Sequence, residues 1–506
     1  MILVEVTAAI DEYGTLKTFF LGTDGFQTAP TDTPADQAFD AALAEPGNIG
    51  LTAFSDGKTS GASKLEVGEV VIRNGDGDYD AWTDYSFDGR RIVIRRGEGG
   101  AYPTDFETIF TGTMESVTVT LESVVIAMRD KAAILDLPVL TTKYAGTNVG
   151  PVGLEGTSDD LKGSVKPRVY GRVFNIAPPC VNTSKLTFQV SGRAVAEIGD
   201  VYDRGVALTF GANHATSAAL TAATIGSGVY DTCLAEGLFR LGSAPTGLIT
   251  ADAASSLDDA ETVASAVLAD LAVDASIAPA DLDSQEFAEL NADAPYVVGL
   301  YLYDETTFRE AMDLVAGSVG AWYGFDAAGV FRCAQLKAPG EPTAEIIEAD
   351  VLDGFERGVA DDNGIPAWRV TVRYRRFWTT QDTDLAGSVA ADRRAALAEE
   401  FRSVTAEDET VKHQWLKATE ITVDTLLVNG ADAQAEADRL LALRRVRRDL
   451  FEVPLDVDAL NDSVFDIMKT VELTHSRFGL SGGRVFRVLS RRLELGFRAI
   501  RLKLWG

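Results

Sequence analysis

The strongest constraint on the fold is a period-two alternation of apolar and polar side chains between residues 64 and 129. Ile92 and Ile94 alternate with arginine and valine, and Val117 and Val119 alternate with threonine. This is the period of a β-strand, whose successive side chains point to opposite faces of a sheet. Glycines that favour turns separate these stretches: Gly75, Gly77, Gly89, Gly97, Gly99 and Gly100. Closely spaced strands with such turns predict a small barrel or sandwich.

The two ends of the chain carry the same signal. Residues 1–22 predict a hairpin, with strands at 2–6 and 15–21 and a turn at 11–14. In the last expected strand, Ile500, Leu502 and Leu504 alternate with basic residues, which indicates sheet rather than a frayed end. The closing strands are expected at 470–474, 484–489, 493–497 and 499–505.

The pattern of apolar and polar residues changes twice in the middle of the chain. Strands are expected at 168–173, 194–201 and 206–210, with a helix of small residues at 215–224. Asp258 and Asp259 are then good N-cap residues for a helix with Val267 and Leu271 on one face. A strand at 296–303, a helix from about 305 and a hairpin at 322–336 complete an α+β pattern. Amphipathic helices are expected at 389–401 and 431–448.

These patterns predict an α+β fold that is predominantly β, with two small β-barrel-like domains at the chain ends. A glycine-, threonine- and serine-rich stretch at 146–163 marks the first boundary. The predicted domains are an N-terminal barrel-like domain at 1–147, a β-rich insertion at 148–257, an α+β module at 258–360 and a C-terminal barrel-like domain with two amphipathic helices at 361–506.

Charge and composition exclude several classes of protein. The chain has 506 residues, of which 76 are acidic and 46 basic, giving a formal net charge of −30. Such a surface repels nucleic acid and anionic membranes. Three widely spaced cysteines do not make a disulfide framework. Because no signal peptide or apolar run of about 20 residues is present, we expect synthesis and folding in a cytoplasm and no membrane insertion.

Candidate metal and nucleophile residues do not form motifs. His214, His413 and His475 lie in unrelated contexts without paired ligands. Cys180 follows two prolines, so no helix N-terminus lowers its pKa. The alternating oxygen ligands of the segment 74–80 are typical of calcium loops. However, an EF-hand loop requires glycine at its sixth position and glutamate at its twelfth, and here Tyr79 and Tyr85 occupy those positions. A turn between strands is favoured there.

Other charged segments also have ordinary explanations. The arginines at 444, 445, 447 and 448 suit phosphate, but they end a helix, where cations complement the dipole. Ion pairs within the protein or with an acidic neighbouring subunit are favoured. The strand at 369–378 presents arginines opposite aromatics, which fits a subunit contact or a half-buried sheet equally. With 76 acids, accidental carboxylate pairs of the glycosidase kind are expected, and no spacing singles one out. The sequence therefore nominates no catalytic, cofactor-binding or metal-binding residue.

The order of segments resembles the central tail hub (baseplate hub) family of long-tailed bacteriophages and prophage-like particles. The resemblance is carried by GEVVIRNGDGDYDAWTDYSFDGRRIVIRRG, by FETIFTGTMESVTVTLESVVIAMRDKAAILDLPV, by KPRVYGRVFNIAPP and by the C-terminal VELTHSRFGLSGGRVFRVLSRRLELGFRAIRLKLWG. It implies a ring, often a trimer, in which each subunit gives two related barrels to a pseudo-sixfold ring through which DNA passes. The segments 88–94 and 482–488 are then expected to be equivalent strands of the two barrels.

The expected function is therefore that of a virion structural protein, not an enzyme, that joins the tail tube to the tip and fibre complex. Its expected partners are further copies of itself and other tail proteins, with no cofactor and no specific binding of nucleic acid. The alternatives are a distal tail protein in a hexameric ring, and a tip-borne protein that binds glycans or degrades the cell wall. The insertion at 148–257 is the expected place for an outward-facing binding function.

Overall fold

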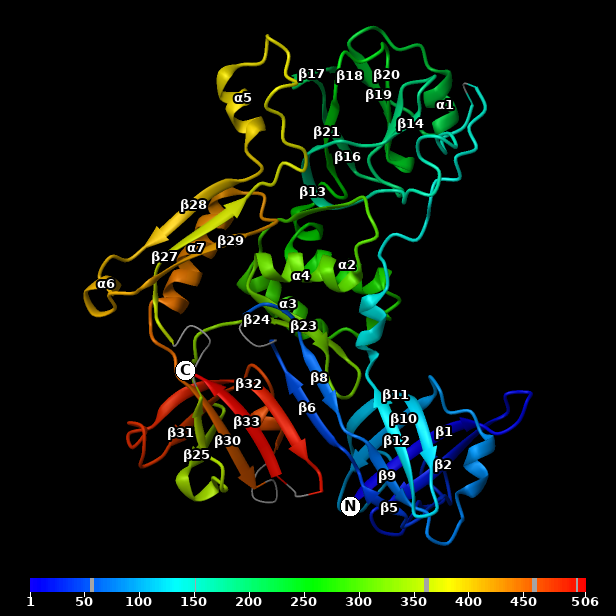
Figure 1. The fold of residues 1–506 in the computed structure, drawn as a ribbon, viewed down its shortest axis with the longest axis vertical. Helices are drawn as coiled ribbons and strands as arrows, with labels where there is room; N and C mark the ends of the chain where they lie inside the picture. Colours follow the sequence, from blue (N-terminus) through cyan, green and yellow to red (C-terminus); the bar gives the residue numbers. More distant parts are fainter. Residues whose placement is uncertain (55–58, 151, 359–363, 457–461, 497–498) are drawn as a thin grey trace.

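The computed structural model describes residues 1–54, 59–150, 152–358, 364–456, 462–496 and 499–506. Figure 1 shows three tiers: two β-domains side by side at one end, a helical layer in the middle, and the β-rich insertion at the other end. Strands predominate over helices, which confirms the α+β, mainly β class. None of the described helices is both long enough and apolar enough to cross a membrane.

The N-terminal domain is built on one sheet of seven strands. In order across the sheet these are β2 (Leu16–Gly22), β1 (Ile2–Ala9), β10 (Arg91–Arg96), β11 (Glu107–Val119), β12 (Ser123–Arg129), β9 (Val70–Arg73) and β5 (Leu43–Glu45). The predicted hairpin at 1–22 is confirmed, since β1 and β2 pair antiparallel. Val4, Ile92 and Ile94 are fully buried, as their alternation indicates. A small pair, β3 (Phe26–Gln27) and β4 (Ala38–Phe39), lies beside the sheet.

The C-terminal domain has a second sheet. Its main path is β25 (Ala344–Ile347), β31 (Thr470–Thr474), β32 (Arg484–Glu494), β33 (Ala499–Trp505), β30 (Leu450–Asp456) and β26 (Glu356–Gly358). The expected strands at 470–474 and 499–505 are confirmed. Those expected at 484–489 and 493–497 are wrong as separate strands. A register shift between Val488 and Ser490 absorbs the break in alternation, so the strand continues to Glu494. Phe497 lies outside the described residues.

The two sheets repeat one topology. Each contains six strands which, numbered in chain order, lie in the order first, fourth, fifth, sixth, third, second. We call β1, β5, β9, β10, β11 and β12 the first repeat, and β25, β26, β30, β31, β32 and β33 the second repeat. The repeats differ in that β1 runs antiparallel to β10, whereas β25 runs parallel to β31.

The fifth strand of each repeat carries the same irregularity. In β11 the pairing with β12 shifts between Met114 and Ser116, and in β32 the pairing with β33 shifts between Val488 and Ser490. Each shift leaves one extra residue, as a β-bulge does. When the two bulges are superposed in sequence, β11 aligns with β32 and Glu115 corresponds to Leu489. The expected equivalence of 88–94 and 482–488 is wrong, because the first segment enters β10, a fourth strand, and the second enters β32, a fifth strand.

The insertion consists of two five-stranded sheets. One has the order β17 (Val206–Ala207), β16 (Glu197–Asp203), β21 (Ile249–Ala254), β13 (Arg168–Ile176) and β22 (Gly299–Leu302). The other has the order β14 (Cys180–Asn182), β15 (Thr187–Gln189), β20 (Leu238–Leu241), β19 (Val229–Cys233) and β18 (Thr209–Asn213). The expected strand at 206–210 is divided between β17 and β18. The expected helix at 215–224 is α1 (Ser217–Ala222).

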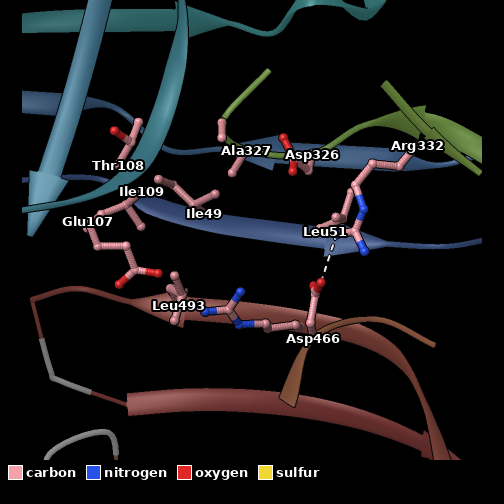
Figure 2. Close-up of a pocket in the computed structure, with 12 residues that line it drawn as sticks. Ile49, Leu51, Glu107, Thr108, Ile109, Asp326, Ala327, Arg332, Asp466 and Leu493 are labelled. Carbon is pink, nitrogen blue, oxygen red and sulfur yellow. Dashed lines mark hydrogen bonds and ion pairs between the residues drawn. The ribbon is translucent and has the colours of Figure 1, made fainter. Parts of the chain in front are cut away.

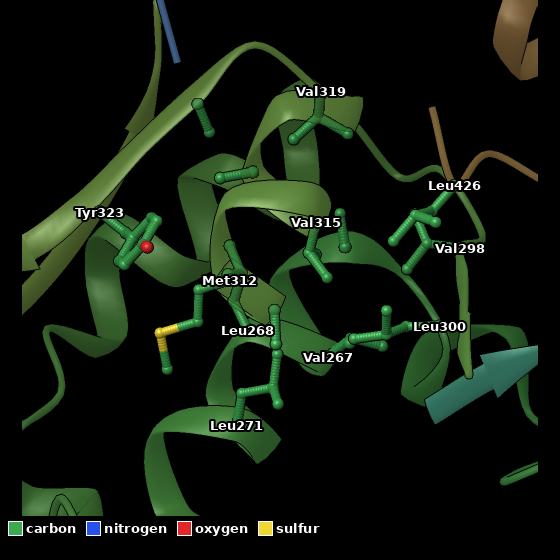
Figure 3. Close-up of a cluster of buried hydrophobic side chains, with 14 of the residues drawn as sticks. Val267, Leu268, Leu271, Val298, Leu300, Met312, Val315, Val319, Tyr323 and Leu426 are labelled. Atoms are coloured by element: carbon green, nitrogen blue, oxygen red, sulfur yellow. The ribbon is translucent and has the colours of Figure 1, made fainter. Parts of the chain in front are cut away.

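The middle tier contains α2 (Ala264–Asp274), α3 (Ser284–Asp293), α4 (Phe308–Ser318) and the hairpin of β23 (Ala321–Phe325) and β24 (Phe331–Gln335). Figure 3 shows its core, where Leu268, Met312 and Val315 meet. Asp258 caps a short 3-10 turn at 259–261, so α2 begins later than predicted, at Ala264. Thr307 and Glu310 form a capping box that starts α4.

An arm extends from the second repeat between β26 and β30. It holds the sheet β28 (Arg402–Glu407), β27 (Ala367–Tyr374) and β29 (Thr419–Asp424), together with α5 (Ala391–Ala398), α6 (Val411–Gln414) and α7 (Gly430–Arg444). Val370 and Ala437 join the same core as the middle tier. The predicted domain boundaries stay predictions. By sheet membership, β22 groups with the insertion and β25 and β26 with the C-terminal strands.

Candidate functional site

The two repeats are joined by a hairpin that leaves the first repeat between β5 and β9. Its strands are β6 (Asn48–Thr52) and β8 (Lys64–Val67), which pair antiparallel. β6 also pairs antiparallel with residues 490–494 of β32, so the second sheet is extended by a strand of the first domain. The hydroxyls of Thr52 and Ser490 are 2.7 Å apart across this pairing. Backbone hydrogen bonds thus connect residues more than 400 positions apart in the sequence.

A shared apolar core reinforces this connection. Ile49 on β6 is 3% exposed and belongs to one buried cluster with side chains of both repeats. The fully buried members include Val4 and Phe110 of the first repeat and Phe451 and Val488 of the second repeat. Separating the repeats would expose this apolar surface to water, at about 25 cal/mol for each Å². The two repeats therefore share one apolar core.

The same hairpin also reaches the middle tier. Its short strand β7 (Gly61–Ala62) pairs parallel with β23. The backbone N–H of Ala62 donates to the Asp313 carboxylate on α4 at 3.0 Å, and the Tyr323 hydroxyl donates to the same carboxylate at 2.8 Å. Burial, the Asp313 charge and this hydrogen bond raise the pKa of Tyr323. The hairpin therefore fixes three parts of the chain relative to one another.

Figure 2 shows the cavity of about 260 Å³ where these parts meet, between β6, β11, the β23–β24 turn and β32. Arg332 on β24 lies at its edge with its guanidinium directed at Asp466, and the two are 2.8 Å apart. The same guanidinium donates from Nε to Glu286 on α3 at 3.1 Å. Burial lowers the pKa of Arg332, but hydrogen bonds and charge from both carboxylates raise it more strongly. This ion-pair network links the middle tier to the second repeat.

A second cavity, of about 480 Å³, lies between the insertion and the arm. Asp252 lines it and is largely buried. Burial raises the pKa of Asp252 to about 6, opposed by the hydrogen bond from the Asn175 backbone and assisted by the Asp200 charge. Arg393 lies over the Tyr202 ring at 4.1 Å. The cavity therefore combines carboxylates, guanidiniums and aromatic faces, a set that suits a hydroxyl-rich ligand.

Arg375 adds an unpaired donor to this polar cavity. Its guanidinium lies 4.5 Å from the Phe174 ring, and its buried Nε has no hydrogen-bond partner among the described residues. The Oδ1 atom of Asn175 is likewise buried without a partner, although that side chain is only 2% exposed. Buried polar atoms without partners are rare in folded proteins. Sequence reasoning missed this cavity because its lining residues come from five separate segments, at 174–175, 200–202, 252, 375–377 and 392–402.

The histidines and cysteines remain apart in the structure. His214 lies 2.8 Å from Asp231, His475 packs 4.4 Å from the Phe355 ring, and His413 is exposed. The three cysteines are free, and burial raises the pKa of each thiol. Within the described ranges, no three His, Cys, Asp or Glu side chains are grouped as a metal ion requires. Among the described residues no hydrogen bond joins a cysteine to a histidine, and the Cys233 thiol donates to the Glu236 carboxylate at 3.9 Å.

The segment 74–80 is a turn whose polar atoms bond to one another. The Asn74 side chain is 1% exposed and donates to the Asp80 carboxylate and to the Thr120 carbonyl, both at 2.9 Å. Its oxygen accepts from the Tyr79 backbone N–H at 2.9 Å. The favoured interpretation as a turn between strands agrees with these contacts.

The arginine cluster after α7 lies among acidic and aromatic neighbours. Arg445 is 3.2 Å from Asp408, and Arg447 is 3.8 Å from Asp449. The Arg448 guanidinium lies over the Trp505 ring, 5.1 Å from its centroid. Burial and the nearby charges of other arginines lower the pKa of Arg448. For Arg445 and Arg447, the expected ion pairs within the protein are present.

The strand at 369–378 is largely β27, the centre of its sheet. Val370 and Val372 are fully buried, whereas Arg373 pairs with Asp424 across the sheet. Arg376 lies over the Trp378 ring at 4.2 Å. These contacts are those of a half-buried sheet, one of the two interpretations left open by the sequence.

No protein-family model and no curated protein matches the chain. The chain is similar to a tail protein from Neisseria meningitidis at 12% identity and TM-score 0.43, covering 93% of this chain and 94% of that one. It is similar to a chain of a native gene transfer agent virion at 16% identity and TM-score 0.43, covering 74% and 91%. A prophage tail protein from Shewanella oneidensis gives 9% identity and TM-score 0.40, covering 100% and 98%. These similarities assign no role to any residue.

Proposed function

We propose that the chain is a structural protein of a bacteriophage-type tail tip, in which each copy contributes two barrel-like units to a ring. The observation that carries the proposal is the repeated six-strand topology, together with the β6 pairing that joins the repeats. Two similar units fixed side by side in one chain are the geometry that a ring of alternating repeats requires. The resemblance of the sequence to tail hubs supports the same role.

Three copies of the chain supply six such units, because each copy has two repeats. A ring of this kind is threefold by chain and nearly sixfold by unit, so it can join a sixfold tube to a threefold tip. Rings are closed by heterologous contacts whose rotation brings the last subunit back to the first. The formal charge of −30 would keep such a ring from holding the DNA that passes through it. Its partners would be tube, tip and fibre proteins of the same virion tail.

The stoichiometry of the purified chain tests this proposal. Mass photometry and class averages from electron microscopy should give a ring of three chains with six lobes. A ring of six chains would contradict it and favour the distal tail protein instead, because six copies would supply twelve units. A particle that remains monomeric at the highest soluble concentration, with and without neighbouring tail proteins, would also contradict it.

A second role, the binding of a glycan, is favoured by the polar cavity between the insertion and the arm. Arg375 and Asn175 line this cavity together with Asp200, Asp252 and Arg393, and amide, carboxylate and guanidinium groups are hydrogen-bonding partners of sugar hydroxyls. Titration of the chain with bacterial cell-surface polysaccharides, monitored by calorimetry, tests this role. Binding that is unchanged in the Arg375→Met variant would contradict it.

A further inference from the structure

Among the described strands, none covers one edge of the second half of β11, the fifth strand of the first repeat. β11 pairs with β10 through residues 107–113 and with β12 through residues 113–119. Residues 115–119 therefore have β12 on one side, and on the other side no strand of the described chain pairs with them. Figure 1 shows β10, β11 and β12 grouped in the N-terminal domain, where β11 is hydrogen-bonded between the other two.

In the second repeat, the equivalent edge of β32 is paired with another strand. β32 pairs with β31 through residues 484–487, with β33 through 487–494, and with β6 through 490–494. With the bulges aligned, Ser116 corresponds to Ser490 and Val119 to Leu493. The edge that β6 covers on β32 is therefore the edge that is open on β11. One of two equivalent positions carries an added strand, and the other does not.

The open edge has the character of a pairing surface. The Thr120 N–H donates to the Ser123 carbonyl at 2.8 Å, which makes 120 and 123 a hydrogen-bonded pair. In an antiparallel ladder the hydrogen-bonded and non-bonded pairs alternate, so Val117 and Val119 direct their backbone groups to the open side. Residues 116–119 include no proline, lysine or other charged side chain that commonly protects an edge strand.

We infer that residues 116–119 of β11 pair with a strand from a second copy of this chain. The inference rests on the proposed ring, and it names the contact that closes it. Within one copy the bridging hairpin is already committed to β32, so it cannot also cover β11. In a ring of alternating repeats, the first repeat of one copy lies next to the second repeat of the following copy. A strand added there repeats between chains the connection that β6 makes within the chain.

Hydrogen exchange resolved to single amides tests the inference with a control in the same strand. In the ring, the amides of Val117 and Val119 should exchange at least tenfold more slowly than in the dissociated chain. The Thr118 amide faces β12 and should be protected in both states. A ring of three in which Val117 and Val119 exchange as fast as in the monomer would overturn the inference and leave the proposed function standing. If no ring of three forms, both fail.

A substitution gives a second readout that does not depend on exchange. Val119→Pro removes an N–H on the open side, and Leu121→Pro lies two residues further along, in the exposed hairpin turn. We expect Val119→Pro to reduce the trimeric fraction at least tenfold at equal concentration, and Leu121→Pro to leave it unchanged. Far-ultraviolet circular dichroism and the melting temperature of the monomers establish that both variants fold. Equal trimeric fractions in two folded variants would overturn the inference.

Discussion

Replacement of Asp252 by asparagine should make the stability of the protein less dependent on pH. The pKa of this buried carboxyl is raised from 3.8 to about 6 in the folded protein. Between these values the folded chain retains a proton that the unfolded chain has released. Stability therefore falls as the pH rises through this interval. Asparagine does not titrate, so Asp252→Asn should lose this part of the pH dependence.

The size of the effect follows from the shift. A shift of about two pKa units, at about 1.4 kcal/mol for each unit, gives about 3 kcal/mol. The free energy of unfolding of Asp252→Asn, measured relative to the wild type, should therefore increase by about 2–3 kcal/mol between pH 4 and pH 8. Any constant cost of packing an amide in the site is the same at each pH and cancels in this comparison.

Chemical denaturation at pH 4, 5, 6, 7 and 8 provides the measurement, with tyrosine and tryptophan fluorescence as the signal. Asp252→Ala is the matched control, because it loses the same carboxyl but also its hydrogen bonds from the Asn175 backbone and the Tyr202 hydroxyl. The two variants should differ by a constant and share one pH dependence. A wild type and an Asp252→Asn variant with parallel pH profiles would refute the assignment of a raised pKa.

Three further predictions concern the ion pairs between the middle tier and the second repeat, and the buried core. Arg332→Met should destabilise the protein by about 3–5 kcal/mol, because it leaves the partly buried carboxylates of Glu286 and Asp466 unpaired. The control Lys143→Met removes an exposed ion pair and should cost less than about 1 kcal/mol. Equal midpoints of the two variants in urea denaturation would contradict this prediction. Ile49→Ala should cost about 2–5 kcal/mol and speed amide exchange in β6, since Ile49 is 3% exposed; an unchanged exchange rate would count against the shared core. Cys333 should react with a thiol reagent at pH 7.5 only after unfolding, because burial raises the pKa of its thiol well above the ordinary value; rapid labelling of the native chain would exclude this.

The sequence was most informative where one face of a strand is buried. The bounds expected for β31 and β33 agree with the structure because buried side chains alternate with partly exposed ones over 471–474 and 500–504. It failed where an irregularity intervenes, as at Leu489 in β32. Helix α3 was missed because Leu290 is its only fully buried side chain, so its apolar pattern is weak.

The repeated strand order and the contacts that join the two repeats and the middle tier could not be predicted from local patterns. The aligned positions Gly112 and Phe486 are both buried but share no chemistry, so the repeated topology leaves little trace in the sequence. The pairing of β6 with β32 and the contact of Arg332 with Asp466 join residues far apart in the chain. Such contacts depend on the topology as a whole and not on the residues near each partner.

The copy number of the assembled ring tests the central claim most directly. A reconstruction of the ring by cryo-electron microscopy, from the purified chain or from a particle that contains it, counts chains and barrel-like units at once. We expect three chains and six units, with the first repeat of each copy next to the second repeat of the following copy. A ring of six chains, or an assembly in which the two repeats of one chain do not lie side by side, would contradict the account.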